Sequence, residues 1–375
     1  MSRFASSFVV GLLVLLGGIG LSAGPATAQT LSPDTPLRAA SGFGTALAVD
    51  GETLFVGDPR SVHAPGRVVM YQRGASGEEW TETGQLEASD ADVGDGFGGA
   101  IAIDDERLVV GAPSAGAVYV FEPGEDAWRQ TARLQPSETP AGQFGATVAV
   151  RGNVIVAGVT DPPFTFDPGR GAAVVFETDG QTWTQTQTLA PDDVAKGEGF
   201  GESLGLTADR LFVGAPGTNR GAGAVHVFAR DASADAWTRQ QTLAGLQGGF
   251  GAAMDASAAA VLIGAPQANG GRGAAQIARP DAETWAVAET LFPFDAPANG
   301  RFGAAVSFGD GSDASGTSRV WIGAPGGTDQ TGALYGLERS GSDAAWSTAS
   351  RRVHPQTTAG ERLGQTLAAF GDVVA

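Results

Sequence analysis

The sequence predicts an all-β protein, a seven-bladed β-propeller with four antiparallel strands in each blade. Three observations support this fold class. A Phe-Gly pair returns along the chain, each copy is followed by the same order of strand-like segments, and 57 glycines provide many turns. A repeat period of about 50 residues is typical of propellers and stacked arrays, in which one supersecondary unit recurs.

The first half of each repeat reads as a β-hairpin. After Phe97, the larger residues Ile101 and Ile103 alternate with alanines, a pattern that predicts a strand packed on both faces. A short turn such as Asp50-Gly51 joins this strand to the next one. The repeats begin near Phe43, Phe97, Phe144, Phe200, Phe250 and Phe302, with a variant at Leu363-Gly364.

The second half of each repeat begins where a strand ends in Gly-Ala-Pro or a variant of it. Proline removes a donor from the strand ladder, so this element is a structural stop and need not be a phosphate-binding loop. A glycine then opens a third strand, and a tryptophan precedes a polar fourth strand. Because the tryptophan recurs in every repeat, packing at the blade edges is favoured over a ring of sugar-binding platforms. Examples of these elements are Gly111-Ala112-Pro113, Gly116 and Trp128 in the second repeat.

Phe-Gly, Gly-Ala-Pro, the apolar third strand and the tryptophan together resemble the FG-GAP repeat. That repeat forms the seven-bladed propeller at the N-terminus of integrin α chains, and related repeats occur in many secreted bacterial proteins. The resemblance covers nearly all of residues 29–375. It implies the fold and says little about activity, since one fold supports many functions.

Residues 1–28 read as a secretory signal peptide. Arg3 is followed by the apolar run Phe8–Leu21 and by Ala26-Thr27-Ala28, which has the form of a cleavage site before Gln29. A retained N-terminal anchor is the alternative. We therefore expect a single propeller domain over residues 29–375, exported to the cell surface or the extracellular space and not integral to the membrane after cleavage.

The ends of the chain suggest how the ring closes. Gln29–Asp34 matches Gln187–Asp192, a fourth strand and its continuation, at five of six positions. We expect this N-terminal strand to complete the last blade, which would hide strand edges. The seventh repeat starts at Leu363 and is cut at Ala375, so we expect a fragment with an incomplete last blade; an open ring is the alternative.

The charge and the missing motifs exclude several function classes. A net charge of −18 disfavours nucleic acid and anionic membranes as partners. The chain has no cysteine, no HExxH and no Gly-x-Ser-x-Gly motif, and His63, His226 and His354 are far apart. We expect no enzyme activity and no cofactor, although a pair of distant carboxylates at the channel mouth is the alternative.

Calcium is considered because integrin-type repeats carry Asp-rich loops. In repeat six, Asp310 and Asp313 could serve as oxygen ligands, but Ala314 stands where a third carboxylate is needed, and a flexible loop is favoured. The loop with Asp90 and Asp95 is also an inexact match.

The loops after the second and fourth strands emerge on one face, which is the expected ligand face. The longest of the loops after second strands lies in repeat three and carries Phe164 and Phe166 between prolines. Stiff aromatic loops with nearby charges suit recognition, whereas folding back over the blade or the channel is the alternative. The candidate binding residues are Asp161, Phe164, Phe166, Asp167, Arg170, Arg220 and Arg272.

These patterns favour a secreted or cell-surface adhesion propeller that recognises an extracellular protein or polysaccharide. Two alternatives stay open: a structural module of a longer exported protein, and a polysaccharide-acting enzyme with convergent carboxylates at the channel mouth.

Overall fold

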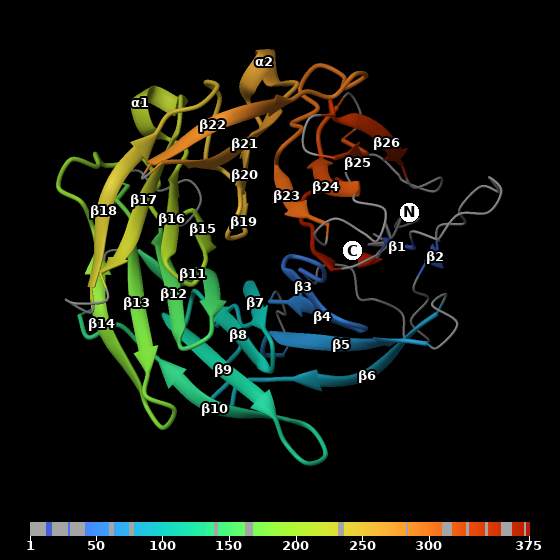
Figure 1. Cartoon of the computed structure of the whole chain (residues 1–375). Helices are drawn as coiled ribbons and strands as arrows, with labels where there is room; N and C mark the ends of the chain where they lie inside the picture. The colour runs from blue at the N-terminus through green and yellow to red at the C-terminus, as the bar shows by residue number, and fades with distance from the viewer. Residues whose placement is uncertain are drawn as a thin grey trace, which may run out of the picture.

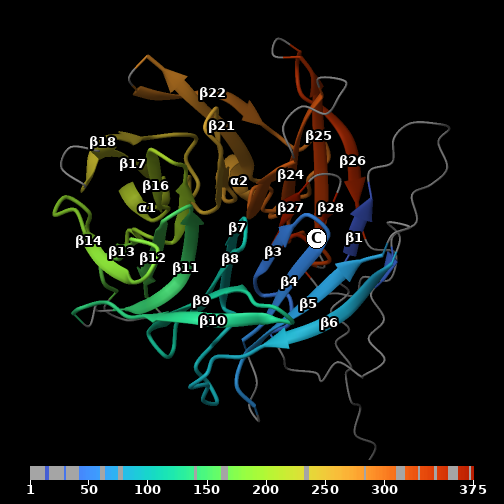
Figure 2. The same cartoon turned by 60° about the horizontal axis from the view of Figure 1, so that its bottom comes forward.

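The computed structural model shows a ring of β-sheets around a central channel (Figures 1 and 2). It describes residues 13–16, 29–30, 42–59, 64–74, 79–138, 142–161, 168–231, 236–282, 284–309, 317–327, 330–341, 344–353, 362–370 and 373–375.

Six consecutive four-stranded antiparallel blades make up the ring, each from one stretch of chain. The first strand of each blade lines the channel and the fourth lies at the outer edge (Figure 1). Blade one is β3 (Leu47–Asp50), β4 (Thr53–Asp58), β5 (Arg67–Arg73) and β6 (Trp80–Leu86). Blade two is β7 (Ala100–Asp104), β8 (Arg107–Ala112), β9 (Ala117–Pro123) and β10 (Trp128–Leu134). Blade three is β11 (Gln143–Arg151), β12 (Val154–Thr160), β13 (Ala172–Thr178) and β14 (Trp183–Leu189).

The second half of the ring repeats this order with two additional helical turns. Blade four is β15 (Ser203–Leu206), β16 (Arg210–Ala215), β17 (Ala224–Asp231) and β18 (Ala236–Leu243), with α1 (Thr218–Gly221) after its second strand. Blade five is β19 (Met254–Ala256), β20 (Val261–Ala265), β21 (Ala274–Asp281) and β22 (Thr284–Leu291), with α2 (Ala268–Gly271) at the same place. Blade six is β23 (Ala305–Phe308), β24 (Thr317–Ala324), β25 (Ala333–Ser340) and β26 (Ser347–Arg352).

The prediction of seven blades is wrong: the structure has six. Between blades six and one lies a small sheet of short segments from both ends of the chain, which we call the terminal sheet. Its strand order is β2 (Gln29–Thr30), β1 (Leu13–Leu16), β28 (Val373–Val374) and β27 (Ala369–Phe370). The run from Leu363 supplies only two strands of two residues each, too short to build a blade like the other six. The segment Leu13–Leu16, assigned to the signal peptide by its sequence, pairs here with β28 and β2.

Glycines set the contact between neighbouring blades. A Cβ added to the glycine of Gly-Ala-Pro would lie well under 3.0 Å from the carbonyl oxygen of the Phe-Gly glycine in the next repeat. The two backbones can approach so closely only because both positions lack a side chain. The pairs are Gly57 with Gly98, Gly111 with Gly145, Gly158 with Gly201, Gly214 with Gly251, Gly264 with Gly303, and Gly323 with Gly364.

The glycine that opens the third strand makes a second backbone contact with the following repeat. Gly223 forms a parallel bridge with Phe250, and Gly273 forms one with Phe302. At Gly223 the backbone has φ +91° and a Cβ would collide with the main chain of Phe250. The Phe-Gly and Gly-Ala-Pro elements are therefore the joints between blades.

The phenylalanine of each Phe-Gly pair is buried between two blades. Phe200, for example, is 0% exposed and packs among residues of blades three and four, including Val175 and Val213. Its ring meets His226 edge-on, with centroids 5.2 Å apart. Full burial of an aromatic side chain contributes about 2–3 kcal/mol, so these residues stabilise the ring at every joint.

The tryptophans pack against the preceding blade, as their recurrence predicted. Trp128 of blade two meets Phe55 of blade one edge-on at 5.4 Å, and Trp285 of blade five meets Phe212 of blade four at 4.8 Å. The polar fourth strand adds a second link. The side-chain amide of Gln241 both donates to and accepts from the backbone of Trp285, each at 2.8 Å.

A single added methyl group at a blade joint should destabilise the protein. In Gly264→Ala the new Cβ would collide with the carbonyl of Gly303, and relief requires the blades to separate. We expect the free energy of unfolding to fall by roughly 2–4 kcal/mol. Urea denaturation followed by tryptophan fluorescence measures this.

Gly74→Ala is the matched control, because its nearest neighbour to an added Cβ lies 3.4 Å away, near ordinary contact distance. Its effect should stay within about 1 kcal/mol. Equal losses in the two variants would show that the joint has no special steric requirement.

Candidate functional site

The loops after the second and fourth strands of the blades lie at one end of the ring, opposite the hairpin turns between first and second strands. We call this end the loop face. The Gly-Ala-Pro element ends each second strand, so each of these loops begins at a blade joint that is held by backbone contacts.

The structure places two of the predicted residues in the repeat-three loop. Asp161 accepts a hydrogen bond from the backbone N–H of Gly169 at 2.9 Å and so closes the base of the loop. Arg170 reaches toward the loop before blade four, where it donates to the carbonyl of Asp192 at 3.2 Å. Phe164, Phe166 and Asp167 lie outside the described residues.

Arg220 and Arg272 are both exposed on the loop face, in the neighbouring loops of blades four and five. Arg220 belongs to α1 and has a left-handed backbone with φ +64°, and Gly270 occupies the corresponding place in α2 with φ +67°. These two arginines therefore lie on the same face of the ring, without a contact between them.

The Asp90 loop is occupied by protein contacts. The carboxylate of Asp90 accepts a hydrogen bond from the hydroxyl of Tyr119 at 2.9 Å and forms an ion pair with Arg133 at 2.8 Å. Asp95 accepts instead from the backbone N–H of Asp92. Within the described ranges, no group of three metal-ligating side chains gathers. The other calcium candidates, Asp310 and Asp313, lie outside these ranges.

The Asp90 contact belongs to a network that recurs around the ring and that the sequence did not reveal. An aspartate after the fourth strand of one blade forms an ion pair with an arginine of the next blade, and that arginine contacts a tyrosine or histidine. Asp90 and Asp295 also accept a hydrogen bond from the tyrosine hydroxyl. The three sets are Asp90, Tyr119 and Arg133; Asp193, His226 and Arg239; and Asp295, Tyr335 and Arg351. They join blades and leave these side chains no evident catalytic task.

His226 is a buried side chain of strand β17. It is 5% exposed within β17, and burial together with the charge of Arg239 lowers its pKa. A ring buried between Phe200 and Arg239 is poorly placed to act as a base on an external substrate.

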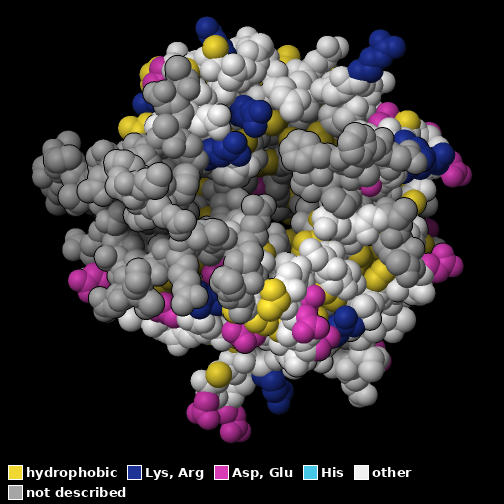
Figure 3. All heavy atoms as spheres, turned by 180° about the vertical axis from the view of Figure 1, so that it is seen from behind, with side chains coloured by type: hydrophobic (Ala, Val, Ile, Leu, Met, Phe, Trp, Pro, Cys, Tyr) yellow, Lys and Arg dark blue, Asp and Glu magenta, His cyan; other side chains and the backbone are white. Residues whose placement is uncertain are grey.

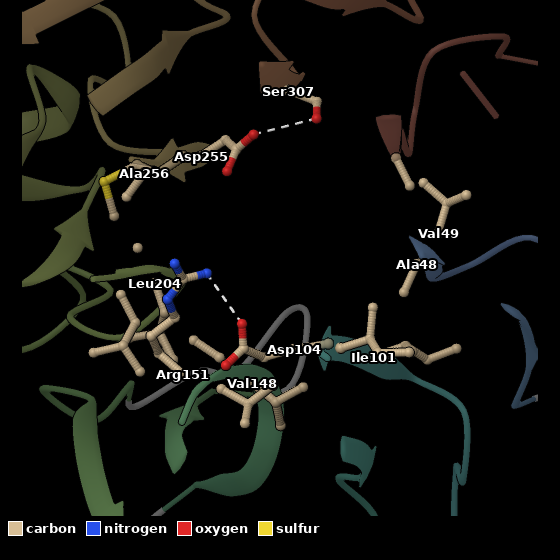
Figure 4. Close-up of a pocket in the computed structure, with 18 of the residues that line it drawn as sticks. Ala48, Val49, Ile101, Asp104, Val148, Arg151, Leu204, Asp255, Ala256 and Ser307 are labelled. Atoms are coloured by element: carbon tan, nitrogen blue, oxygen red, sulfur yellow. Dashed lines mark hydrogen bonds and ion pairs between the residues drawn. The ribbon is translucent and has the colours of Figure 1, made fainter. Parts of the chain in front are cut away.

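The central channel encloses a cavity of about 340 Å³ lined mostly by aliphatic side chains of the first strands. Two carboxylates project into it (Figure 4). Asp104 forms an ion pair with Arg151 at 3.0 Å and accepts from the N–H of Gly152. Asp255 accepts from the backbone N–H of Phe308 at 2.8 Å and from the hydroxyl of Ser307 at 3.2 Å.

Asp255 links blade five to blade six in apolar surroundings. Burial raises its pKa, and the hydrogen bonds from Phe308 and Ser307 oppose this shift only in part. Sequence reasoning missed Asp104 and Asp255 because the channel exists only once the ring has closed.

A second cavity, of about 220 Å³, opens on the loop face between blade six and the run from Leu363. We call it the arginine pocket. Its polar side chains are Asn299, Arg301, Gln330, Arg362 and Gln365, and its other wall is formed by Pro325, Gly326 and Gly327. None of the described residues that line it is a carboxylate.

The backbone of the arginine pocket is strained. Asn299, Arg301, Gln330 and Arg362 have left-handed φ values of 57°, 59°, 50° and 53°, and they are four of the nine described non-glycine residues with positive φ. Each such residue costs about 1–2 kcal/mol, and strain of this kind often clusters at functional sites.

The sequence did contain a signal for this pocket. The residue before Phe-Gly is a glycine in repeats one, two, four and five, and in the last three of these Gly96, Gly199 and Gly249 have φ 74°, 71° and 76°. Arg301 and Arg362 replace that glycine and keep its backbone conformation.

Charged side chains of both signs are spread over the face seen in Figure 3, without a continuous basic surface among the described residues. No helix in the described part of the chain is both long enough and apolar enough to cross a membrane.

The raised pKa of Asp255 predicts a pH-dependent effect of Asp255→Asn. The folded protein holds the proton of Asp255 more tightly than the unfolded chain, whose aspartates titrate at about 3.9. The protonated form contributes its full stabilisation below the pKa of the unfolded chain. This stabilisation is lost as the pH rises through the pKa of Asp255 in the folded protein. Because asparagine stays neutral, the variant should gain stability relative to wild type as the pH rises from 4 to 8.

Denaturation midpoints of both proteins across this pH range test the prediction, with Asp126→Asn in an exposed turn as the control. A difference between wild type and Asp255→Asn that does not change with pH would contradict it.

Comparisons with known proteins agree with the architecture. The sequence profile of the FG-GAP repeat matches residues 80–121 and 183–228. No curated protein matches the sequence. A solved protein from Lactobacillus plantarum has a similar fold, with a TM-score of 0.55, 13% sequence identity, and coverage of 92% of this chain and 97% of that one. At this identity the similarity concerns the fold alone. The matched repeats and the ring of four-stranded blades identify the chain as an FG-GAP repeat β-propeller.

Proposed function

We propose that the protein is an exported binding propeller that recognises an extracellular polysaccharide or protein through its loop face. The FG-GAP propeller commonly serves as a binding module. The single observation that carries the proposal is the arginine pocket, a strained polar cavity on the loop face of an otherwise acidic protein. The N-terminal sequence, with its apolar run and small residues before Gln29, supports export.

The surroundings of the pocket also favour recognition. The loops of blades four and five present Arg220 and Arg272, and the loop of blade three is bound to its neighbour through Arg170. Loops held at both ends by a rigid scaffold lose little conformational entropy on binding.

The channel offers weaker support for a polysaccharide-acting enzyme. Asp104 and Asp255 both project into the cavity, but each already accepts two protein hydrogen bonds. A pair of carboxylates engaged in this way has little freedom to transfer protons or attack a sugar.

A binding panel tests the proposal. The purified protein is applied to immobilised neutral glycans, acidic glycans and extracellular-matrix proteins, with the double variant Arg220→Gly, Arg272→Ala alongside. Glycine at position 220 copies Gly270 of blade five, so the backbone should be preserved. We expect binding to one class of ligand, weakened about threefold or more in the variant, because desolvated arginines contribute strongly at interfaces.

The control is Arg129→Ala, Arg210→Ala, which removes the same charge away from the loop face. Equal weakening in both variants would point to long-range charge and count against a loop-face site. Absence of binding to every ligand would leave the propeller as a scaffold module.

A further inference from the structure

We infer that the arginine pocket binds the carboxylate of a uronic acid unit in an acidic polysaccharide. This inference rests on the proposed loop-face recognition and names the ligand class of one site on that face. Arg301 and Arg362 would hold the carboxylate, and the side-chain amides of Asn299, Gln330 and Gln365 would contact sugar hydroxyls.

The charge of the pocket is the first argument. The protein has 41 acidic and 23 basic residues, yet among the described residues this cavity is lined by two arginines and no carboxylate. Among the described residues neither guanidinium forms an ion pair, whereas twelve ion pairs are found elsewhere between arginines and carboxylates. Two arginines that have no counter-charge in the described part of an acidic protein are positioned for an external anion.

The backbone is the second argument. Arg301 and Arg362 stand where other repeats have glycine, and each adopts the left-handed conformation that glycine would adopt without strain. Each main chain is also fixed: the N–H of Arg301 donates to the carbonyl of Gly271 at 3.1 Å, and that of Arg362 to the carbonyl of Gln330 at 2.9 Å. Burial of the side chains does not compensate for this backbone strain, since both arginines are exposed.

Orientation of one guanidinium is the third argument. The Nε of Arg362 donates to the Oε1 of Gln330 at 3.0 Å, which limits rotation of the arginine. Its terminal nitrogens stay available for a planar carboxylate, which a guanidinium fork matches with two parallel hydrogen bonds.

The volume and lining favour a sugar over a larger ligand. A cavity of about 220 Å³ is smaller than the roughly 300–1,000 Å³ typical of drug-sized ligands and suits one sugar unit. Three amide side chains provide both donors and acceptors, as a polyhydroxylated ring requires.

The first experiment measures binding by calorimetry with oligogalacturonate, neutral galactan oligosaccharides and galactose 6-sulfate. We expect binding of oligogalacturonate and at least tenfold weaker binding of the neutral oligosaccharide, since a charge-assisted pair contributes about 1.5–3 kcal/mol. Preference for the sulfate ester would overturn the assignment of a carboxylate. Binding of a neutral ligand alone would overturn the inference while leaving loop-face recognition intact.

The second experiment uses Arg301→Gly and Arg362→Gly, which restore the residue found in other repeats. Because glycine relieves the left-handed strain, both variants should melt at a temperature equal to or higher than wild type while oligogalacturonate binding falls at least tenfold. A lower melting temperature with unchanged binding would show a structural role and overturn the inference.

Two controls complete the design. Arg129→Ala removes an exposed arginine from an outer strand and should leave oligogalacturonate binding unchanged. Arg301→Lys keeps the charge but not the fork, and should bind several-fold more weakly than wild type. The contrary result is full affinity in Arg301→Lys together with a loss of affinity in Arg129→Ala as large as that in Arg301→Gly. It would show that binding depends only on net charge and would count against a built site.

Discussion

The close backbone contact between neighbouring blades is the constraint on which the rest of the structure depends. At each joint, the glycine of Gly-Ala-Pro meets the glycine of the next Phe-Gly pair, and neither position has room for a Cβ. This contact places the phenylalanine between two sheets, where it is fully or nearly fully buried. It also fixes where each second strand ends and therefore where the loops of the loop face begin.

A scaffold of this kind separates stability from recognition. The joints, the buried aromatic pairs and the Asp–Tyr–Arg or Asp–His–Arg networks hold the blades together. The exposed positions of the loops can depart from the repeat, because their side chains do not pack in the ring. Arg301 and Arg362 are such departures. They adopt a left-handed backbone that is strained for arginine but not for glycine, and they place exposed positive charge around a cavity.

Much of the scaffold could be predicted from the sequence, because a repeat reports the same packing requirement several times. The repeat predicted the strands, the strand-ending role of Gly-Ala-Pro and the packing of the tryptophans. It did not predict the number of blades. The repeats count to seven, but the run after Leu363 forms only two-residue strands in the terminal sheet.

The candidate sites were harder to predict because they form between distant segments. Asp104 and Asp255 meet the same cavity only through closure of the ring, and the arginine pocket joins residues from 299 to 365. Of the predicted binding residues, Asp161 and Arg170 proved to hold their own loop in place. The informative signal was a departure from the repeat, arginine in place of glycine before Phe302 and Leu363, rather than a motif.

Hydrogen–deuterium exchange of the full chain, with and without oligogalacturonate, tests most directly whether ligand binding is confined to the arginine pocket while the blades stay unchanged. The account predicts slower exchange on binding at residues 299–301, 325–327, 330 and 362–365, with no change in the strands of blades one to five. Protection spread over the blade strands, or centred on the channel-lining strands around Asp104 and Asp255, would contradict it.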